Sequence, residues 1–131
     1  MIKFFTKYKI IFYSSNFILI LLYLFPGSLI GCFLYNDCKL QPQITRDYII
    51  SSNHLYAFAI LSLIGFLTYK NSKKIRYLSG YLIVVSIFLE IFHNFIPERS
   101  FEYSDLFGNL AGVIIVIIVF NLFKIYENPK N

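Results

Sequence analysis

The chain has 131 residues, of which 57% are hydrophobic and only 15% are charged, and its formal net charge is +5. Soluble domains carry roughly 25% charged residues, so this composition excludes an ordinary soluble domain and indicates lipid as the surrounding solvent. The basic residues lie in short blocks between long apolar runs, as in membrane proteins, and we predict no nucleic-acid partner. The length suits one domain, residues 1–131.

Four stretches are apolar enough to cross the hydrocarbon layer as helices, which takes roughly 20 residues each. They cover about residues 10–34, 49–69, 75–96 and 106–123. Helices are expected because lipid offers no partner to an exposed backbone, and the alternating pattern of a membrane barrel is not present in the sequence. The sequence therefore predicts an all-α fold, a bundle of four transmembrane helices.

The charges between the predicted spans indicate their orientation. Three lysines precede the first span, and the basic block Lys70–Arg76 separates the second from the third. The loop between the first two spans is balanced in charge, and the loop between the last two is net acidic. Because basic loops stay in the cytoplasm, we expect both termini to be cytoplasmic, including the tail that contains Lys130.

The two cysteines, Cys32 and Cys38, leave several interpretations open. Their spacing does not match the C-x-x-C spacing that recurs in metal sites. In an oxidising compartment they would form a disulfide, and two free thiols are equally compatible with the sequence. The lysines before an apolar run that ends in Gly31-Cys32 also resemble a lipoprotein signal peptide. This run is long for such a signal, so we expect an uncleaved first helix.

Several ionisable or polar residues lie near membrane depth, where a charge costs on the order of 2.5–3.5 kcal/mol and marks a functional candidate. They open the second predicted helix, close the third and open the fourth: His54, Glu90, His93, Asp105 and Asn109. Antiparallel neighbours in a bundle bring these three helix ends together. We therefore predict one shallow, outward-facing polar pocket.

Helical spacing supports this pocket, although each residue also has a simpler interpretation. Glu90 and His93 are three positions apart, and Asp105 and Asn109 four apart, so each pair shares a helix face. Asp105 would alternatively cap the fourth helix. Glu90 would alternatively reach the headgroups by itself, and both histidines would be neutral interfacial residues.

Three further residues belong to the same region. Gly108 and Gly112 form a small-x-x-x-small pair, which predicts close packing of another helix against the fourth. Arg99 lies in the acidic loop. It would contact a lipid phosphate, or alternatively pair with Glu98 or Glu102.

The pair Glu90-x-x-His93 also occurs in di-iron four-helix bundles, with further carboxylates on facing helices. His54 and Asp105 would then complete a four-ligand set. Those bundles contain two such pairs and two additional glutamates, whereas this chain contains one pair. We therefore predict no metal and no cofactor.

The second half of the chain resembles the signature of the VanZ-like family, small membrane proteins named after a teicoplanin-resistance accessory protein. The resemblance rests on the motifs Glu90-x-x-His93, Pro97-x-Arg99 and Asp105-x-x-x-Asn109-x-x-Gly112. The segment from His54 to Phe58 resembles the second helix of the family, so the resemblance covers about residues 50–115.

The chain departs from the family pattern at several positions. His93 stands where the family usually has Gln, and Ile50 and Ser51 stand where many members carry Asp-Lys. Phe58 stands where a Tyr is common. The polar cluster of the family is therefore recognisable here without being complete.

The resemblance implies a protein of the bacterial cytoplasmic membrane that acts at the outer leaflet or on envelope precursors. We expect the pocket to bind a membrane lipid or a lipid-linked envelope precursor. Glu90, Asp105 and Asn109 would hydrogen-bond its polar head, and Arg99 would meet a phosphate or carboxylate. An effect on glycopeptide susceptibility is a further expectation.

Two other classes stay open. One is a membrane-embedded hydrolase or transferase acting on a lipid-linked phosphate, with His54 or His93 as the base. The sequence contains no nucleophile elbow, zinc motif or P-loop in its favour, so whether the chain is an enzyme stays undecided. The other is a transporter or channel subunit. Four short helices are few for a transport pathway unless several copies of the chain assemble.

Overall fold

A computed structural model describes residues 1–128, and every regular element among them is helical. The elements follow in the order α1 (Ile2–Lys7), α2 (Ile10–Leu24), α3 (Leu29–Tyr35), α4 (Ser52–Tyr69), α5 (Ile75–Phe92), the 3-10 turn η1 (His93–Phe95) and α6 (Tyr103–Glu127). The predicted all-α class is confirmed. The expectation for Lys130 lies outside the described residues.

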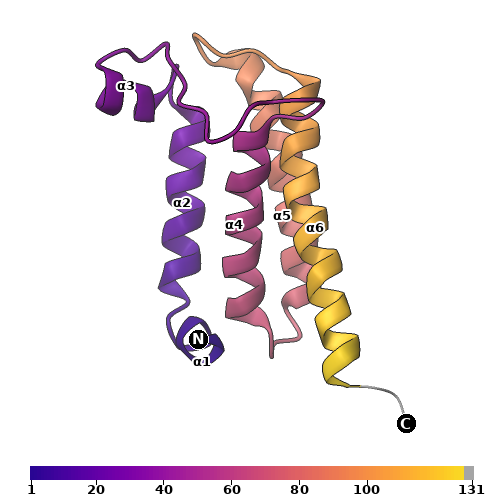
Figure 1. Cartoon of the computed structure of the whole chain (residues 1–131). Helices are drawn as coiled ribbons and strands as arrows, with labels where there is room; N and C mark the ends of the chain where they lie inside the picture. The colour runs from indigo at the N-terminus through magenta and orange to yellow at the C-terminus, as the bar shows by residue number, and fades with distance from the viewer. Residues whose placement is uncertain (129–131) are drawn as a thin grey trace.

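The helices α2, α4, α5 and α6 lie side by side, with α1 and the end of α6 at one end of the bundle (Figure 1). At the opposite end lie α3, the chain that leads to α4, and the connection from η1 to α6 (Figure 1). We call this opposite end, formed by residues 25–51 and 96–102 with the adjoining helix ends, the polar end.

Helix α4 is the central element and packs most closely against α6. Two glycines of α6 permit this approach. A Cβ atom on Gly108 would lie 2.6 Å from the carbonyl oxygen of Ser51, and one on Gly112 would lie 2.8 Å from the amide nitrogen of Ala59. Any larger residue would push the backbones of the two helices apart, so these glycines set how closely α6 can approach α4.

The first predicted span, residues 10–34, is not one continuous helix. It is broken after Leu24, and α2 and α3 meet at an angle of 82°. Pro26 disfavours helical backbone at the preceding residue, and Phe25 accordingly has an extended conformation (φ −70°, ψ 132°). Gly27 follows with φ 81°, which glycine adopts without steric cost. The expectation of a single helix is therefore wrong beyond Leu24.

The chain after α3 folds back onto this break. Cys32 and Cys38 form a disulfide, one of the interpretations that the sequence left open. The Ser28 side chain accepts a hydrogen bond from the Gly31 amide at 3.0 Å and caps α3. The Ser28 amide in turn donates to the Cys38 carbonyl at 2.7 Å. The segment therefore forms a closed turn at the polar end.

Within residues 1–128, two helices are long and apolar enough to cross a membrane, namely α6 and the continuous pair of α5 and η1, Ile75–Phe95. The bent pair of α2 and α3 passes the same test as one unit, which makes three. Helix α4 has 18 residues but is less apolar, because it contains polar residues such as Asn53 and His54. The side chains of His54, Ser62 and Thr68 are buried against its neighbours. Helices of this length and composition indicate a membrane protein.

Candidate functional site

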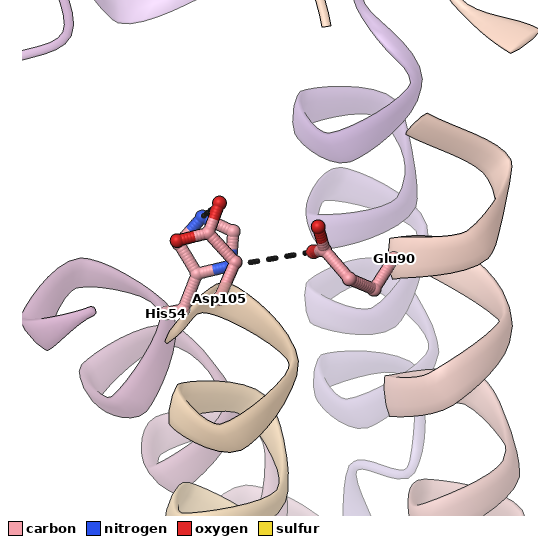
Figure 2. A group of neighbouring side chains, drawn as sticks. All are labelled: His54, Glu90 and Asp105. Carbon is pink, nitrogen blue, oxygen red and sulfur yellow. Dashed lines mark ion pairs between the residues drawn. The ribbon is translucent and has the colours of Figure 1, made fainter. Parts of the chain in front are cut away.

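Three ionisable side chains from three helices meet at the polar end. His54 lies in the first turn of α4, Glu90 in the last turn of α5 and Asp105 in the first turn of α6. His54 Nε2 lies 3.4 Å from Asp105 Oδ2, and His54 Nδ1 lies 3.9 Å from Glu90 Oε2. Figure 2 shows Glu90 reaching from its helix toward the His54 and Asp105 pair. His54 and Glu90 are buried, and Asp105 is half-buried.

Asn109 and Tyr23 fix the orientation of the His54 ring. The Asn109 amide donates to the Ser86 carbonyl at 3.1 Å, so its Oδ1 faces the imidazole. The Tyr23 hydroxyl donates to this Oδ1 at 2.7 Å, and His54 Nδ1 lies 3.0 Å from both oxygens. Because Oδ1 accepts only, Nδ1 carries the hydrogen, and in the neutral ring Nε2 presents its lone pair to Asp105.

His93 is oriented in the same manner against Glu90. Its Nε2 donates to the Tyr23 carbonyl at 3.1 Å, which leaves Nδ1 facing Glu90 Oε1 at 3.3 Å. The same Oε1 accepts the Glu102 amide at 3.1 Å. Within residues 1–128, the other oxygen of Glu90, Oε2, has no hydrogen-bond partner.

The two histidines therefore share one arrangement. Each uses one ring nitrogen as a donor to an acceptor-only oxygen and turns the other toward a carboxylate. A lone pair facing a carboxylate becomes favourable only when a proton or another cation lies between them. The chemistry available to the site is thus the binding of protons, of a cation, or of hydrogen-bond donors from a ligand.

Arg99 has a structural partner that the sequence did not reveal. Its Nε donates to the Phe25 carbonyl at 3.3 Å and one Nη to the Leu22 carbonyl at 3.0 Å. These carbonyls lack helical partners because α2 ends there. Burial lowers the pKa of the Arg99 guanidinium from its ordinary value, and it stays charged because that value is far above neutral. Within the described part of the chain, neither Glu98 nor Glu102 forms an ion pair with it.

A cavity of about 280 Å³ opens at the polar end beside this network. Every lining residue is polar or ionisable: Gln41, Gln43, Asp47, Ser51, Asn53, His54, His93, Glu98, Arg99, Ser100, Glu102 and Asp105. The segment 36–51, which connects α3 to α4, crosses the end of α4 (Figure 1). It supplies Gln41, Gln43, Asp47 and Ser51 to the cavity. The cavity therefore carries four carboxylates and one arginine, which makes it acidic.

The structure brings all the predicted polar candidates to one region. His54, Glu90, His93 and Asn109 belong to a single buried network, while Asp105 and Arg99 line the adjoining cavity. The helix of Asp105 begins earlier than the sequence indicated, at Tyr103. Asp105 therefore lies in the first turn and not at the cap position, where its charge still meets the positive end of the helix.

Sequence reasoning missed Tyr23, which links three members of the network. Little in the sequence indicated its role. Tyr23 lies among leucines, three positions before Pro26, and there it resembles the aromatic residues that line membrane interfaces. The cavity residues contributed by the segment before α4 were missed as well. No local pattern shows that this segment crosses the bundle, because its path depends on the fold as a whole.

Comparisons with protein-family models, with curated proteins and with solved structures give no match to this chain. The resemblance to the VanZ-like family therefore stays a prediction that rests on the motifs alone.

Proposed function

We propose that the chain is an integral protein of the bacterial cytoplasmic membrane, with α2, α4, α5 and α6 as its four spans. All four helices expose large apolar side chains, for example Phe17, Ile60, Phe88 and Ile118. An apolar surface on every helix is unfavourable in water and suits lipid. The polar side chains of His54, Ser62 and Thr68 in α4 are buried inside the bundle, where a spanning helix tolerates them.

In this proposal the polar end faces outward and both termini face the cytoplasm. The disulfide between Cys32 and Cys38 lies at the polar end and suits an oxidising compartment. The basic block Lys70–Arg76 lies at the other end and suits the cytoplasm. Alkaline phosphatase inserted within residues 41–44 should be active, whereas a fusion after Glu127 should be inactive. The reverse pattern would overturn the orientation.

We propose that the cavity at the polar end binds the polar head of a membrane lipid or a lipid-linked envelope precursor. The observation that carries this proposal is an entirely polar cavity at one end of a bundle with an apolar exterior. A ligand anchored in the outer leaflet presents its head at this level. The cavity has more carboxylates than arginines, which favours a head that offers amino or hydroxyl groups.

Different groups of the cavity would bind different parts of such a head. Asp105 and the other cavity carboxylates would accept hydrogen bonds from amino or hydroxyl groups, whereas Glu90 and Asn109 are fully buried and would act only by positioning His54. Two N–H groups of Arg99 donate hydrogen bonds to the carbonyls of Leu22 and Phe25 at the end of α2. Its remaining N–H groups would bind a phosphate or carboxylate. A zwitterionic head with an amine and a phosphate satisfies both requirements.

The test is lipid retention measured by native mass spectrometry, after reconstitution with phosphatidylethanolamine or phosphatidylglycerol. Asp105→Asn should lower occupancy by phosphatidylethanolamine at least tenfold. Asp37→Asn is the matched control, because Asp37 is an exposed carboxylate at the same end that does not line the cavity. Equal retention by both variants would refute the proposal.

The family resemblance extends the proposal to glycopeptide susceptibility. Teicoplanin is lipidated, so a protein that binds lipid-linked ligands at the outer leaflet would alter its access to envelope precursors. Expression in a teicoplanin-sensitive bacterium should raise the inhibitory concentration, and Asp105→Asn should abolish the increase. An unchanged inhibitory concentration with the native protein would remove this part of the proposal.

A membrane-embedded hydrolase or transferase for lipid-linked phosphates is the second candidate. It is favoured by the free His54 Nε2 at the cavity wall, which would accept a proton as a base, with Asp105 at 3.4 Å stabilising the imidazolium that forms. The measurement is phosphate release from a polyprenyl diphosphate by the purified protein. His54→Gln should abolish turnover while binding persists. No release above the level of this variant would exclude the enzyme.

A further inference from the structure

His54, Glu90 and Asp105 converge so that each can offer one ligand atom to a metal ion. One donor atom from each residue lies within 4.8 Å of the other two. Ligands about 2.0–2.2 Å from a common tetrahedral ion lie roughly 3.3–3.6 Å apart, so side-chain movements of about 1 Å would place all three around one ion. The three residues come from three different helices, and the packing of those helices therefore builds the cluster.

The electron pairs in the cluster point to a cation. His54 Nε2 and Asp105 Oδ2 are both acceptors when the imidazole is neutral, and they face each other at 3.4 Å. Glu90 Oε2 is fully buried and has no hydrogen-bond partner among residues 1–128. A proton on His54 would satisfy Asp105 but would leave Glu90 Oε2 unpaired, which is costly for a buried carboxylate. A single ion at His54 Nε2 satisfies all three once the Glu90 carboxylate turns toward Asp105, because Glu90 Oε2 now lies beside His54 Nδ1 at 3.9 Å.

The surroundings resemble the outer shell of a metal site. His54 Nδ1 donates to Asn109 Oδ1, which fixes the ring with Nε2 free to coordinate. Glu90 Oε1 accepts the Glu102 amide, which orients the carboxylate and leaves Oε2 free. Such hydrogen bonds hold ligands in place before an ion arrives.

We propose that His54, Glu90 and Asp105 bind one divalent transition-metal ion, with Mn²⁺ and Zn²⁺ as the ions of suitable chemistry. One imidazole with two carboxylates favours these ions over Ca²⁺ or Mg²⁺, which prefer oxygen ligands alone. Three protein ligands leave coordination positions open toward the acidic cavity, through which an ion would enter. The inference is independent of what the cavity binds.

The proposal replaces the sequence-based expectation of no metal, which considered the Glu90-x-x-His93 pair. The structure uses His93 differently. Its Nε2 donates to the Tyr23 carbonyl and its Nδ1 faces Glu90 Oε1, so it acts as a partner of Glu90. The ligand set of the proposal keeps three of the four residues that the sequence suggested, namely His54, Glu90 and Asp105, and leaves out His93.

The test uses the full chain, purified in detergent and stripped with a chelator, and Mn²⁺ as the probe. Loss of the free Mn²⁺ signal in electron paramagnetic resonance should show one bound ion per chain. Electron spin-echo modulation should show coupling to the nitrogen of one imidazole. Asp105→Asn should weaken binding at least about tenfold, because the loss of a ligand costs no less than the loss of a group that orients one. Glu98→Gln should bind as the native chain does, because Glu98 lines the cavity without belonging to the cluster.

Three results would overturn the proposal. They are the absence of stoichiometric binding, the absence of nitrogen coupling in the native chain, and equal weakening by Asp105→Asn and Glu98→Gln, which would indicate general attraction to acidic groups. The first two need no variant, so a misfolded variant does not obscure them. Circular dichroism confirms that each variant keeps its helices. Lipid retention is measured separately, so each proposal can fail alone.

Discussion

Replacing Gly112 by Ala tests how far the close packing of α6 against α4 supports the structure. The new Cβ would lie 2.8 Å from the Ala59 amide nitrogen and 3.1 Å from the Phe58 Cβ, and it would also strike the Leu55 carbonyl oxygen. Ordinary contacts of this kind begin at about 3.5 Å, so α6 would have to move away from α4 by at least roughly 0.7 Å. All three obstacles lie on or beside the backbone, and no side-chain rotation removes them.

Overpacking of this kind costs about 1–3 kcal/mol. Exchanging Gly for Ala within a helix also gains up to about 1 kcal/mol in helix propensity, which partly hides the cost. Gly80→Ala provides the matched control. Gly80 lies in the exposed face of α5, and a Cβ there would meet nothing within 4 Å. The difference between the two variants therefore isolates the clash.

Reversible unfolding in mixed micelles with increasing SDS, followed by circular dichroism, measures this difference. Gly80→Ala should be as stable as the native chain or slightly more stable. Gly112→Ala should be less stable than Gly80→Ala by about 1–3 kcal/mol. Equal stability of the two variants would show that α6 does not approach α4 as closely as the structure has it, and the convergence of the polar residues at the same interface would lose its support.

Three further predictions concern single contacts. Tyr23→Phe removes a buried hydroxyl but leaves the imidazole and amide beside it bonded to each other, so unfolding in SDS should show a loss of only about 0.5–1.5 kcal/mol. The native chain should take up no thiol-alkylating reagent before reduction and two groups after it, because Cys32 and Cys38 are bonded; uptake before reduction, or a mass that indicates cleavage and lipidation at Cys32, would contradict the disulfide. Lys70→Ala breaks the exposed ion pair with Glu127 and should cost at most about 1 kcal/mol in the same unfolding assay, with the difference shrinking as salt rises.

Much of the fold was accessible from hydropathy. The third predicted span, residues 75–96, nearly coincides with α5 and η1, which end at Phe95. The fourth was predicted too short, because α6 extends from Tyr103 to Glu127 beyond the uninterrupted apolar run. The helix break at Pro26 was indicated by the proline itself, which an average of hydropathy over the segment does not take into account. Polar residues inside α4 lower its apolarity although they face its neighbours, so composition by itself understates that helix.

The sequence likewise predicted some residues of the candidate site and missed others. Ionisable residues near membrane depth are expensive, and this cost alone singled out His54, Glu90 and Asp105 and indicated that their helix ends meet. Their hydrogen-bond partners were not accessible in the same way. Tyr23 joins the network only because the end of α2 packs beside α4 and α5, and its hydroxyl and carbonyl serve different partners there.

By itself the sequence determined the helical class, the apolar exterior and which end of the helices is polar, because each depends on local composition and period. Only the tertiary structure decided which atoms of these residues face one another. The approach of α6 to α4 at Gly108 and Gly112 sets the distance between His54 and Asp105, and it follows from contacts between residues about 50 positions apart. Local patterns carry no information about such distances, which are set when the helices pack together.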